Sequence, residues 1–295
     1  MRAAAALLGL LALAAAGSAV AESILFIGNS FTYGEHSPVQ HFAPETVRDL
    51  NHHGVGGVPA LFKAFADEAG LRYEVSLETA ASMGLDFHYE DKRDVITGRW
   101  DHVVLQGYST LDAQAPGNPA KLIDYAGRLA DLFHERNPQV DVRLVATWSR
   151  ADQTYLPGGH WYGRPIEAMA LDIRRACDQA AATSGRVRGV IPVGEAWLEA
   201  MHSGIALADP YHPGSSARID LWAPDNYHAS TEGYYLEALV IFATVTGRSP
   251  AALGPGERAA ATLGIAPDTV LALEQAAART LAAEHAPAHR ASSPE

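Results

Sequence analysis

The chain has 295 residues and a formal net charge of −12, with 34 acidic residues against 22 Lys and Arg. Phosphate backbones and anionic membrane surfaces repel such a chain, so we expect neither nucleic acid nor a charged membrane as a partner. The single cysteine, Cys177, excludes an intramolecular disulfide. It lies within a helical pattern, where we expect a small core residue.

Residues 1–21 have the pattern of a secretory signal peptide. Arg2 gives a positive start, an alanine- and leucine-rich run follows, and Ala19-Val20-Ala21 is a small-residue cleavage signal. We expect cleavage near Ala21 and no stable membrane anchor afterwards; the alternative is an uncleaved N-terminal anchor. An exported chain without a disulfide suits a bacterial periplasm or exterior better than a eukaryotic secretory route.

Buried-strand patterns then alternate with amphipathic helical patterns. In chain order the sequence predicts a strand at 23–28, a helix at 58–70, strands at 72–80 and 101–107, a helix at 120–138, a strand at 141–148, a helix at 165–185, a strand at 186–194 and a helix at 230–247. One or two alanine-rich helices follow from about Arg248, and 286–295 reads as a frayed tail.

This alternation is typical of an α/β domain with a parallel sheet between helices. The strand at 101–107 contains the continuous apolar run Val103-Val104-Leu105, as in a strand buried on both faces. We therefore expect one domain over 22–285, with a roughly five-stranded parallel sheet in a three-layer, flavodoxin-like arrangement. Two long polar connections, 149–164 and 202–228, carry Trp, Tyr and His and are candidates for the ligand-binding edge.

The first strand ends in Gly28-Asn29-Ser30, which places a serine at the ligand-binding edge of the sheet. Gly28 permits a tight turn and a close backbone approach. A serine hydroxyl needs a base within hydrogen-bond reach, and that base needs an orienting group. Asp225 and His228, three apart in a polar turn before a helix, can supply both; the alternative is an ordinary helix-capping loop.

The blocks "FIGNSFT" and "DNYHAST" together resemble the first and last sequence blocks of the SGNH (GDSL-like) hydrolase family. The resemblance runs over about 23–250. It implies Ser30 as nucleophile and Asp225 and His228 as the rest of a catalytic triad. The family's usual Gly-Asp-Ser stands here as Gly-Asn-Ser, which keeps the serine.

The resemblance also implies an oxyanion site. In the family, a glycine after the second strand and an Asn after the third assist the nucleophile's own N–H. Here Gly84 is the best match for the glycine, the alternative being a plain loop glycine. Gln106 stands where the Asn is usual, with the same amide donor on a longer stem. The chain thus resembles an outlying subgroup, with Ser30, Gly84 and Gln106 as oxyanion donors.

Other motifs point to weaker candidates. The chain lacks the Gly-x-Ser-x-Gly elbow, and its Gly54–Gly57 run lacks the strand and Lys-Ser/Thr of a phosphate loop. His36, His41, His52 and His53 cluster in sequence, but without the spacing of a metal motif we expect surface histidines and no metal. Aromatic residues of the 148–162 region either form a wall for a sugar ring or pack on the domain; they are Trp148, Tyr155, His160, Trp161 and Tyr162.

From these patterns we expect an exported serine ester hydrolase that works through an acyl-enzyme and needs no cofactor. The favoured substrate is an acetylated carbohydrate. The alternatives are a short-chain lipid or aryl esterase or thioesterase and, from another class, a non-catalytic carbohydrate-binding module. Such a module would have no reason to keep Ser30, Asp225 and His228 together.

Overall fold

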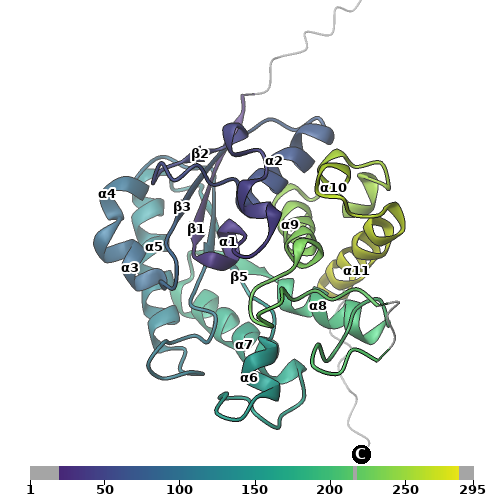
Figure 1. Ribbon diagram of the computed structural model, residues 1–295. Coiled ribbons are helices and arrows are strands. Elements are labelled where there is room, and N and C mark those ends of the chain that lie inside the picture. The colour runs from purple at the N-terminus through teal and green to yellow at the C-terminus, as the bar shows by residue number, and fades with distance from the viewer. Residues whose placement is uncertain (1–19, 215–217, 286–295) are drawn as a thin grey trace, which may run out of the picture.

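A computed structural model describes residues 20–214 and 218–285 (Figure 1). Six parallel strands form one sheet in the order β2-β3-β1-β4-β5-β6. Their bounds are β1 Glu22–Gly28, β2 Arg48–Asp49, β3 Tyr73–Thr79, β4 His102–Gln106, β5 Asp141–Val145 and β6 Val187–Ile191. The α/β class, the parallel sheet and the covering helices are confirmed.

The helices are α1 Ser30–Tyr33, α2 Gly57–Glu68, α3 Leu85–Asp91, α4 Arg93–Ile96, α5 Ala120–Arg136, α6 Ala151–Tyr155, α7 Glu167–Ser184, α8 Val193–His202, α9 Thr231–Thr246, α10 Arg258–Leu263 and α11 Pro267–His285, with short 3₁₀ turns at Pro38–His41, Pro44–Thr46 and Pro250–Ala252. Helix α9 begins and ends as its sequence predicts. Ser230 Oγ accepts the N–H of Gly233, and Gly247 adopts the left-handed conformation.

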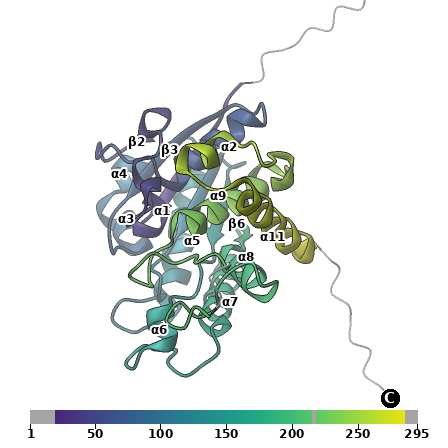
Figure 2. The ribbon, with the colours of Figure 1, turned by 45° about the vertical axis from the view of Figure 1, so that its right-hand side comes forward.

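Successive side chains of β1 point to opposite faces of the sheet and build two cores. Ile24 and Phe26 pack with α2, α8, α9 and α11, whereas Leu25 and Ile27 pack with α3, α5 and α7. The views in Figures 1 and 2 show these helix layers on either side of the strands. Both faces of β1 are therefore buried, which explains its unbroken apolar sequence.

The carboxyl end of β1 lies at the topological switch point of the sheet. The chain passes from β1 through α2 to β3 on one side, and later enters β4 on the other side of β1. Open α/β sheets bind ligands where the strand order reverses in this way. Helix α1, which begins at Ser30, sits at that position (Figure 1).

Two expectations about the fold need correction. The sheet has six strands and not five, because Arg48–Asp49 pairs with Ser76 and Leu77 at the edge. A two-residue charged edge strand carries no hydrophobic pattern. The strand predicted over 186–194 ends at Ile191, and α8 begins at Val193 without a capping side chain to mark its start.

Some sequence predictions fall on residues outside the described part. The signal peptide over 1–21 lies outside it except for Val20 and Ala21, and the tail at 286–295 lies outside it entirely. Within the described part, no helix has the length and apolarity needed to cross a bilayer.

Candidate active site

Ser30 is the first residue of α1 and follows β1 through a tight turn. The Asn29 side chain caps this helix by accepting the N–H of Phe31 at 3.2 Å. Gly28 is required here, because a Cβ at this position would lie 2.1 Å from Thr32 Oγ1. Ser30 itself is only 4% exposed. The sequence thus predicts correctly that the strand ends in a close backbone approach that presents a serine at the sheet edge.

Asn29 ties the serine turn to the neighbouring strand ends. Its side-chain Nδ2 donates to the carbonyl oxygens of Met83 and Gly107, at 2.9 and 3.3 Å. Met83 follows β3 and Gly107 follows β4, the two strands that flank β1. Asn29 therefore connects the ends of three neighbouring strands, and its amide can donate to these carbonyls where the carboxylate of an Asp could not.

Gln106 hydrogen-bonds the same turn, a positioning role that the sequence does not predict, and its expected role as an oxyanion donor stays a prediction. Its Oε1 accepts the N–H of Asn29 at 3.0 Å and the hydroxyl of Thr32 at 3.1 Å, and its Nε2 donates to Gly107 O. The orientation of the amide is fixed because a backbone N–H needs an oxygen opposite it. Gln106 is 1% exposed and positions the turn, and Gly107 O engages one of the two N–H donors of its amide.

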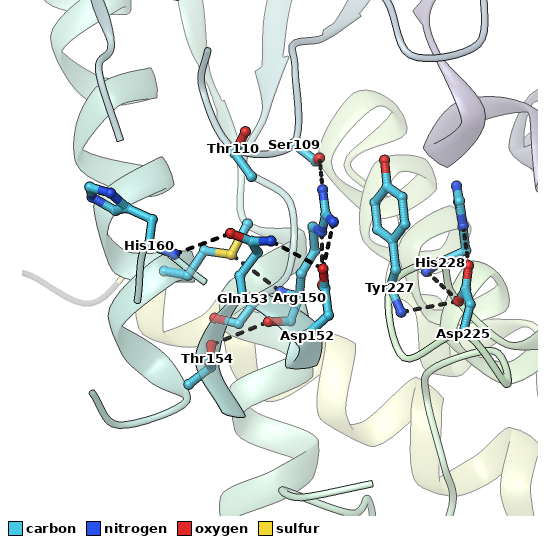
Figure 3. A network of polar contacts seen from close by, with 12 residues as sticks. Ser109, Thr110, Arg150, Asp152, Gln153, Thr154, His160, Asp225, Tyr227 and His228 are labelled. Atoms are coloured by element: carbon cyan, nitrogen blue, oxygen red, sulfur yellow. Dashed lines mark hydrogen bonds and ion pairs between the residues drawn. The ribbon is translucent and has the colours of Figure 1, made fainter. Parts of the chain in front are cut away.

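Asp225 and His228 lie together in the turn before α9. Asp225 Oδ2 and His228 Nδ1 are 2.6 Å apart, and Asp225 Oδ1 accepts the backbone N–H groups of Tyr227 and His228 at 3.0 Å each (Figure 3). This contact fixes the proton on Nδ1. His228 Nε2 is buried and, within the described residues, has no hydrogen-bond partner, Ser30 included.

The electrostatics of the pair suit a neutral imidazole beside a carboxylate. Burial acts to raise the pKa of Asp225, but hydrogen bonds from His228 and from the backbone N–H groups outweigh burial and lower that pKa below its ordinary value. Burial lowers the pKa of His228 and outweighs Asp225, which acts to raise it. At neutral pH the ring is therefore uncharged and can accept a proton at Nε2.

Trp148 joins the serine turn to the histidine turn. Its indole stacks on Phe31 with ring centroids 4.2 Å apart, and its Nε1 donates to Tyr227 O at 3.2 Å. The Phe31 ring also meets the His228 ring edge-on at 5.6 Å. Phe31 follows Ser30 and Tyr227 precedes His228, so one buried side chain sets the spacing between the two turns. The structure thus brings Ser30, Asp225 and His228 to one rim of the sheet.

Of the aromatic residues expected either to form a wall for a sugar ring or to pack on the domain, the two tryptophans pack in the core. Trp148 and Trp161 are both 0% exposed, and Trp161 Nε1 donates to Asp172 at 2.7 Å. Tyr155 donates its hydroxyl to Ala208 O, and His160 packs edge-on against Trp161. Large apolar rings are drawn into the core even where the surrounding sequence is polar. The two tryptophans therefore present no face to a sugar.

Gly84 lies at the mouth of a neighbouring cavity. It is the N-cap residue of α3 and, with Met83, Gly107 and Tyr108, lines a space of about 380 Å³. The Asn29 side chain bonds the carbonyls of two of these lining residues. The cavity is therefore adjacent to the serine turn, and the oxyanion role expected for Gly84 stays a prediction.

Arg150 is a member of the site that sequence reasoning missed. Its guanidinium lies 3.5 Å from the centre of the Tyr227 ring and donates to Ser109 Oγ and to both oxygens of Asp152. Figure 3 shows Tyr227 between Arg150 and His228. No motif marks this residue, because its contacts come from three separate segments of the chain.

The chain also contains a second Asp-x-Tyr-His segment, which sequence reasoning did not separate from the first. Asp209 Oδ2 lies 3.0 Å from His212 Nδ1, and Asp209 Oδ1 accepts the N–H of Tyr211. The local contacts match those of Asp225 and His228. However, the His212 side chain is 86% exposed, whereas that of His228 is 8% exposed.

Comparisons with known proteins define the fold. No family model matches the chain, and a search of curated proteins gives no match either. Among solved structures, a DUF4886 family protein from Bacteroides uniformis matches with a TM-score of 0.61 and 17% identity, over 90% of this chain and 97% of that one. A putative GDSL-like lipase from Parabacteroides merdae matches with a TM-score of 0.52 and 15% identity, over 77% and 95%.

At these identities the likeness shows the fold. The chain shares the three-layer α/β fold of these two structures, one of them a putative GDSL-like lipase, as its sequence patterns predict. Both structures are covered almost throughout, so the likeness is not confined to one supersecondary unit.

Proposed function

We propose that this chain is an exported serine ester hydrolase in which Ser30, His228 and Asp225 form the catalytic triad. The proposal depends on the 2.6 Å contact between Asp225 and His228, with His228 Nε2 buried near the serine turn and without a hydrogen-bond partner among residues 20–214 and 218–285. A carboxylate bound to Nδ1 selects the tautomer whose Nε2 can take a proton from serine. The shared fold with a putative GDSL-like lipase supports the same reaction class.

In the proposed reaction, Ser30 Oγ attacks the ester carbonyl while its proton passes to His228 Nε2. Asp225 stabilises the imidazolium that forms, and the imidazolium then protonates the departing alcohol. Water, deprotonated by the same nitrogen, attacks the acyl-enzyme; the acid leaves and Ser30 recovers its proton. Every proton moves through one ring nitrogen, so the low pKa of His228 keeps that nitrogen free at neutral pH.

The developing oxyanion is held by the backbone N–H groups of Ser30 and Gly84. Backbone donors fixed before the reaction stabilise charge without reorganisation, which makes them effective in a partly dry site. Gln106 contributes by positioning, since its Oε1 holds Asn29 and Thr32 on either side of the nucleophile.

The favoured substrate is an acetylated carbohydrate. The cavity beside Gly84 is lined by the carboxylates of Asp86, Glu90, Asp91 and Asp112 and by one cation, Lys121, which pairs with Asp112. The excess of carboxylates offers acceptors to sugar hydroxyls and disfavours anionic lipids. Its volume of about 380 Å³ is at the small end of the range for ligand pockets. A short acyl group on a polar alcohol fits these conditions better than a long lipid chain.

The test is hydrolysis of p-nitrophenyl acetate by the purified chain without added metal. We expect Ser30→Ala to abolish turnover while its circular dichroism and melting temperature stay those of the wild type. Activity that survives in Ser30→Ala but is lost with a chelator would overturn the proposal. A panel of acetylated sugars against acyl esters of increasing chain length then tests the substrate class; a preference for long chains would contradict it.

A further inference from the structure

We propose that His36, Asp225 and His228 form a zinc site that blocks the active site reversibly. One ligand atom from each of the three side chains lies within 4.8 Å of the others. His36 Nε2 is 3.6 Å from Asp225 Oδ2, and the His36 and His228 rings are 4.9 Å apart in an edge-on arrangement. The inhibitory part of this inference rests on the proposed function, but the metal site itself does not.

The fold holds His36 against the histidine turn. His36 has a φ of 63°, in the left-handed region that few residues other than glycine adopt. The next residue, Ser37, places its hydroxyl 3.2 Å from the hydroxyl of Thr231 at the start of α9. Because α9 begins three residues after His228, this contact fastens the His36 turn beside the Asp225–His228 pair.

The donor set suits zinc. Imidazole nitrogens and carboxylate oxygens are common zinc ligands, at about 2.0–2.2 Å from the ion. Two such ligands in a tetrahedral site stand about 3.4 Å apart, close to the 3.6 Å between His36 and Asp225. The His228 ring nitrogen on the side of Asp225 is Nδ1, which lies 2.6 Å from Asp225 Oδ2, so an ion held by both atoms would displace the Nδ1 proton.

The site is also accessible to an ion. The His36 side chain is 54% exposed and that of Asp225 is 32% exposed, so one side faces solvent and leaves room for water as a fourth ligand. His228 closes the buried side. The site therefore resembles an open, three-ligand zinc position more than a closed structural one.

Zinc and ester hydrolysis would compete for the same groups. An imidazole that binds zinc through Nδ1 carries its proton on Nε2 and cannot accept the Ser30 proton there, and an Asp225 oxygen bound to zinc no longer balances an imidazolium. Hard cations such as Mg²⁺ prefer oxygen ligands in octahedral sites and should not bind here. We therefore expect zinc, and not magnesium, to suppress the reaction, and a chelator to restore it.

The experiment is calorimetric titration of chelator-treated protein with ZnCl₂, paired with p-nitrophenyl acetate assays at matched zinc concentrations. The key variant is His36→Asn, because asparagine tolerates left-handed backbone and lacks the imidazole. The matched control is His52→Asn, since His52 is also an exposed histidine in the left-handed region, with a φ of 59°. Ser30→Ala supplies a chain without the proposed nucleophile.

We expect one zinc ion per chain in the wild type, in Ser30→Ala and in His52→Asn, and at least about tenfold weaker binding in His36→Asn. Zinc should lower the hydrolysis rate of each active variant in proportion to its occupancy. Equal affinity in His36→Asn and the wild type, or a zinc-saturated wild type that keeps its rate, would overturn the inference. If no variant hydrolyses the ester, the proposed function fails while calorimetry still decides the metal site.

Discussion

Replacing Asp225 by asparagine tests how the carboxylate controls its histidine. The new side chain would keep an oxygen for the N–H groups of Tyr227 and His228, which Asp225 Oδ1 accepts at 3.0 Å. Its amide NH₂ would then face His228 Nδ1, where Asp225 Oδ2 now lies at 2.6 Å. Two donors cannot share one contact, so the ring must move its proton to Nε2 and can no longer accept one from Ser30.

The expected loss is large because the wrong tautomer removes the base itself. We expect kcat for p-nitrophenyl acetate to fall by about 10⁴-fold, equivalent to about 5 kcal/mol of transition-state stabilisation. KM should change little, since the ester does not bind Asp225. Steady-state kinetics at pH 7 measure both, and near-ultraviolet circular dichroism checks that the turn stays folded.

Asp209→Asn is the matched control for this variant. Asp209 makes the same contacts to His212 and to the N–H of Tyr211, but its histidine is exposed. We expect its kcat to stay within about twofold of the wild type, as for most surface changes away from a site. A kcat of Asp225→Asn within tenfold of the wild type, or an equal fall in Asp209→Asn, would refute the reasoning.

Three further predictions concern the support of the site and the core. Trp148→Phe keeps an aromatic ring against Phe31 but loses the hydrogen bond to Tyr227 O. We expect kcat to fall about tenfold, which corresponds to the free energy of one hydrogen bond. Unchanged kinetics would show that Trp148 does not position the site. Gln106→Ala leaves the N–H of Asn29 without its acceptor. We expect chemical denaturation to show a free energy of unfolding lower by about 1–3 kcal/mol, together with a lower kcat. A lower kcat at unchanged stability would instead favour the oxyanion role. Burial raises the pKa of Glu274 from 4.5 to about 7, so the wild type loses stability as the pH rises between these values, by at most about 3 kcal/mol. Glu274→Gln should therefore melt at a higher temperature than the wild type at pH 8 and at nearly the same temperature at pH 4.5, and equal melting at both would contradict this sign.

Most of the fold could be predicted because its signals are local. The apolar run Val103-Val104-Leu105 marks a strand buried on both faces, and Ser230 and Gly247 mark the ends of α9. The missed elements lack such signals. Strand β2 is two charged or polar residues at an edge, and α8 starts inside the apolar run that ends β6, with no capping side chain.

The site was less predictable because its distinguishing features are tertiary. Two Asp-x-Tyr-His segments have nearly the same local contacts, and only burial separates His228 from His212. Trp148 precedes the polar connection at 149–164 and Trp161 lies within it, yet both are fully buried. The role of Gln106 depends on tertiary contacts, because its side-chain amide bonds Asn29 and Thr32 beyond the end of β1. The roles of Ser30, Asp225 and His228 in catalysis stay predictions.

The most direct measurement of the central claim is covalent labelling with an alkyl fluorophosphonate, followed by peptide mass spectrometry. An activated serine forms a stable adduct with such a reagent, whereas an ordinary buried serine does not. We predict one adduct per chain on the peptide that contains Ser30, none in Ser30→Ala and much slower labelling in Asp225→Asn. A folded wild-type chain that remains unlabelled, or that carries the adduct at another residue, would contradict it.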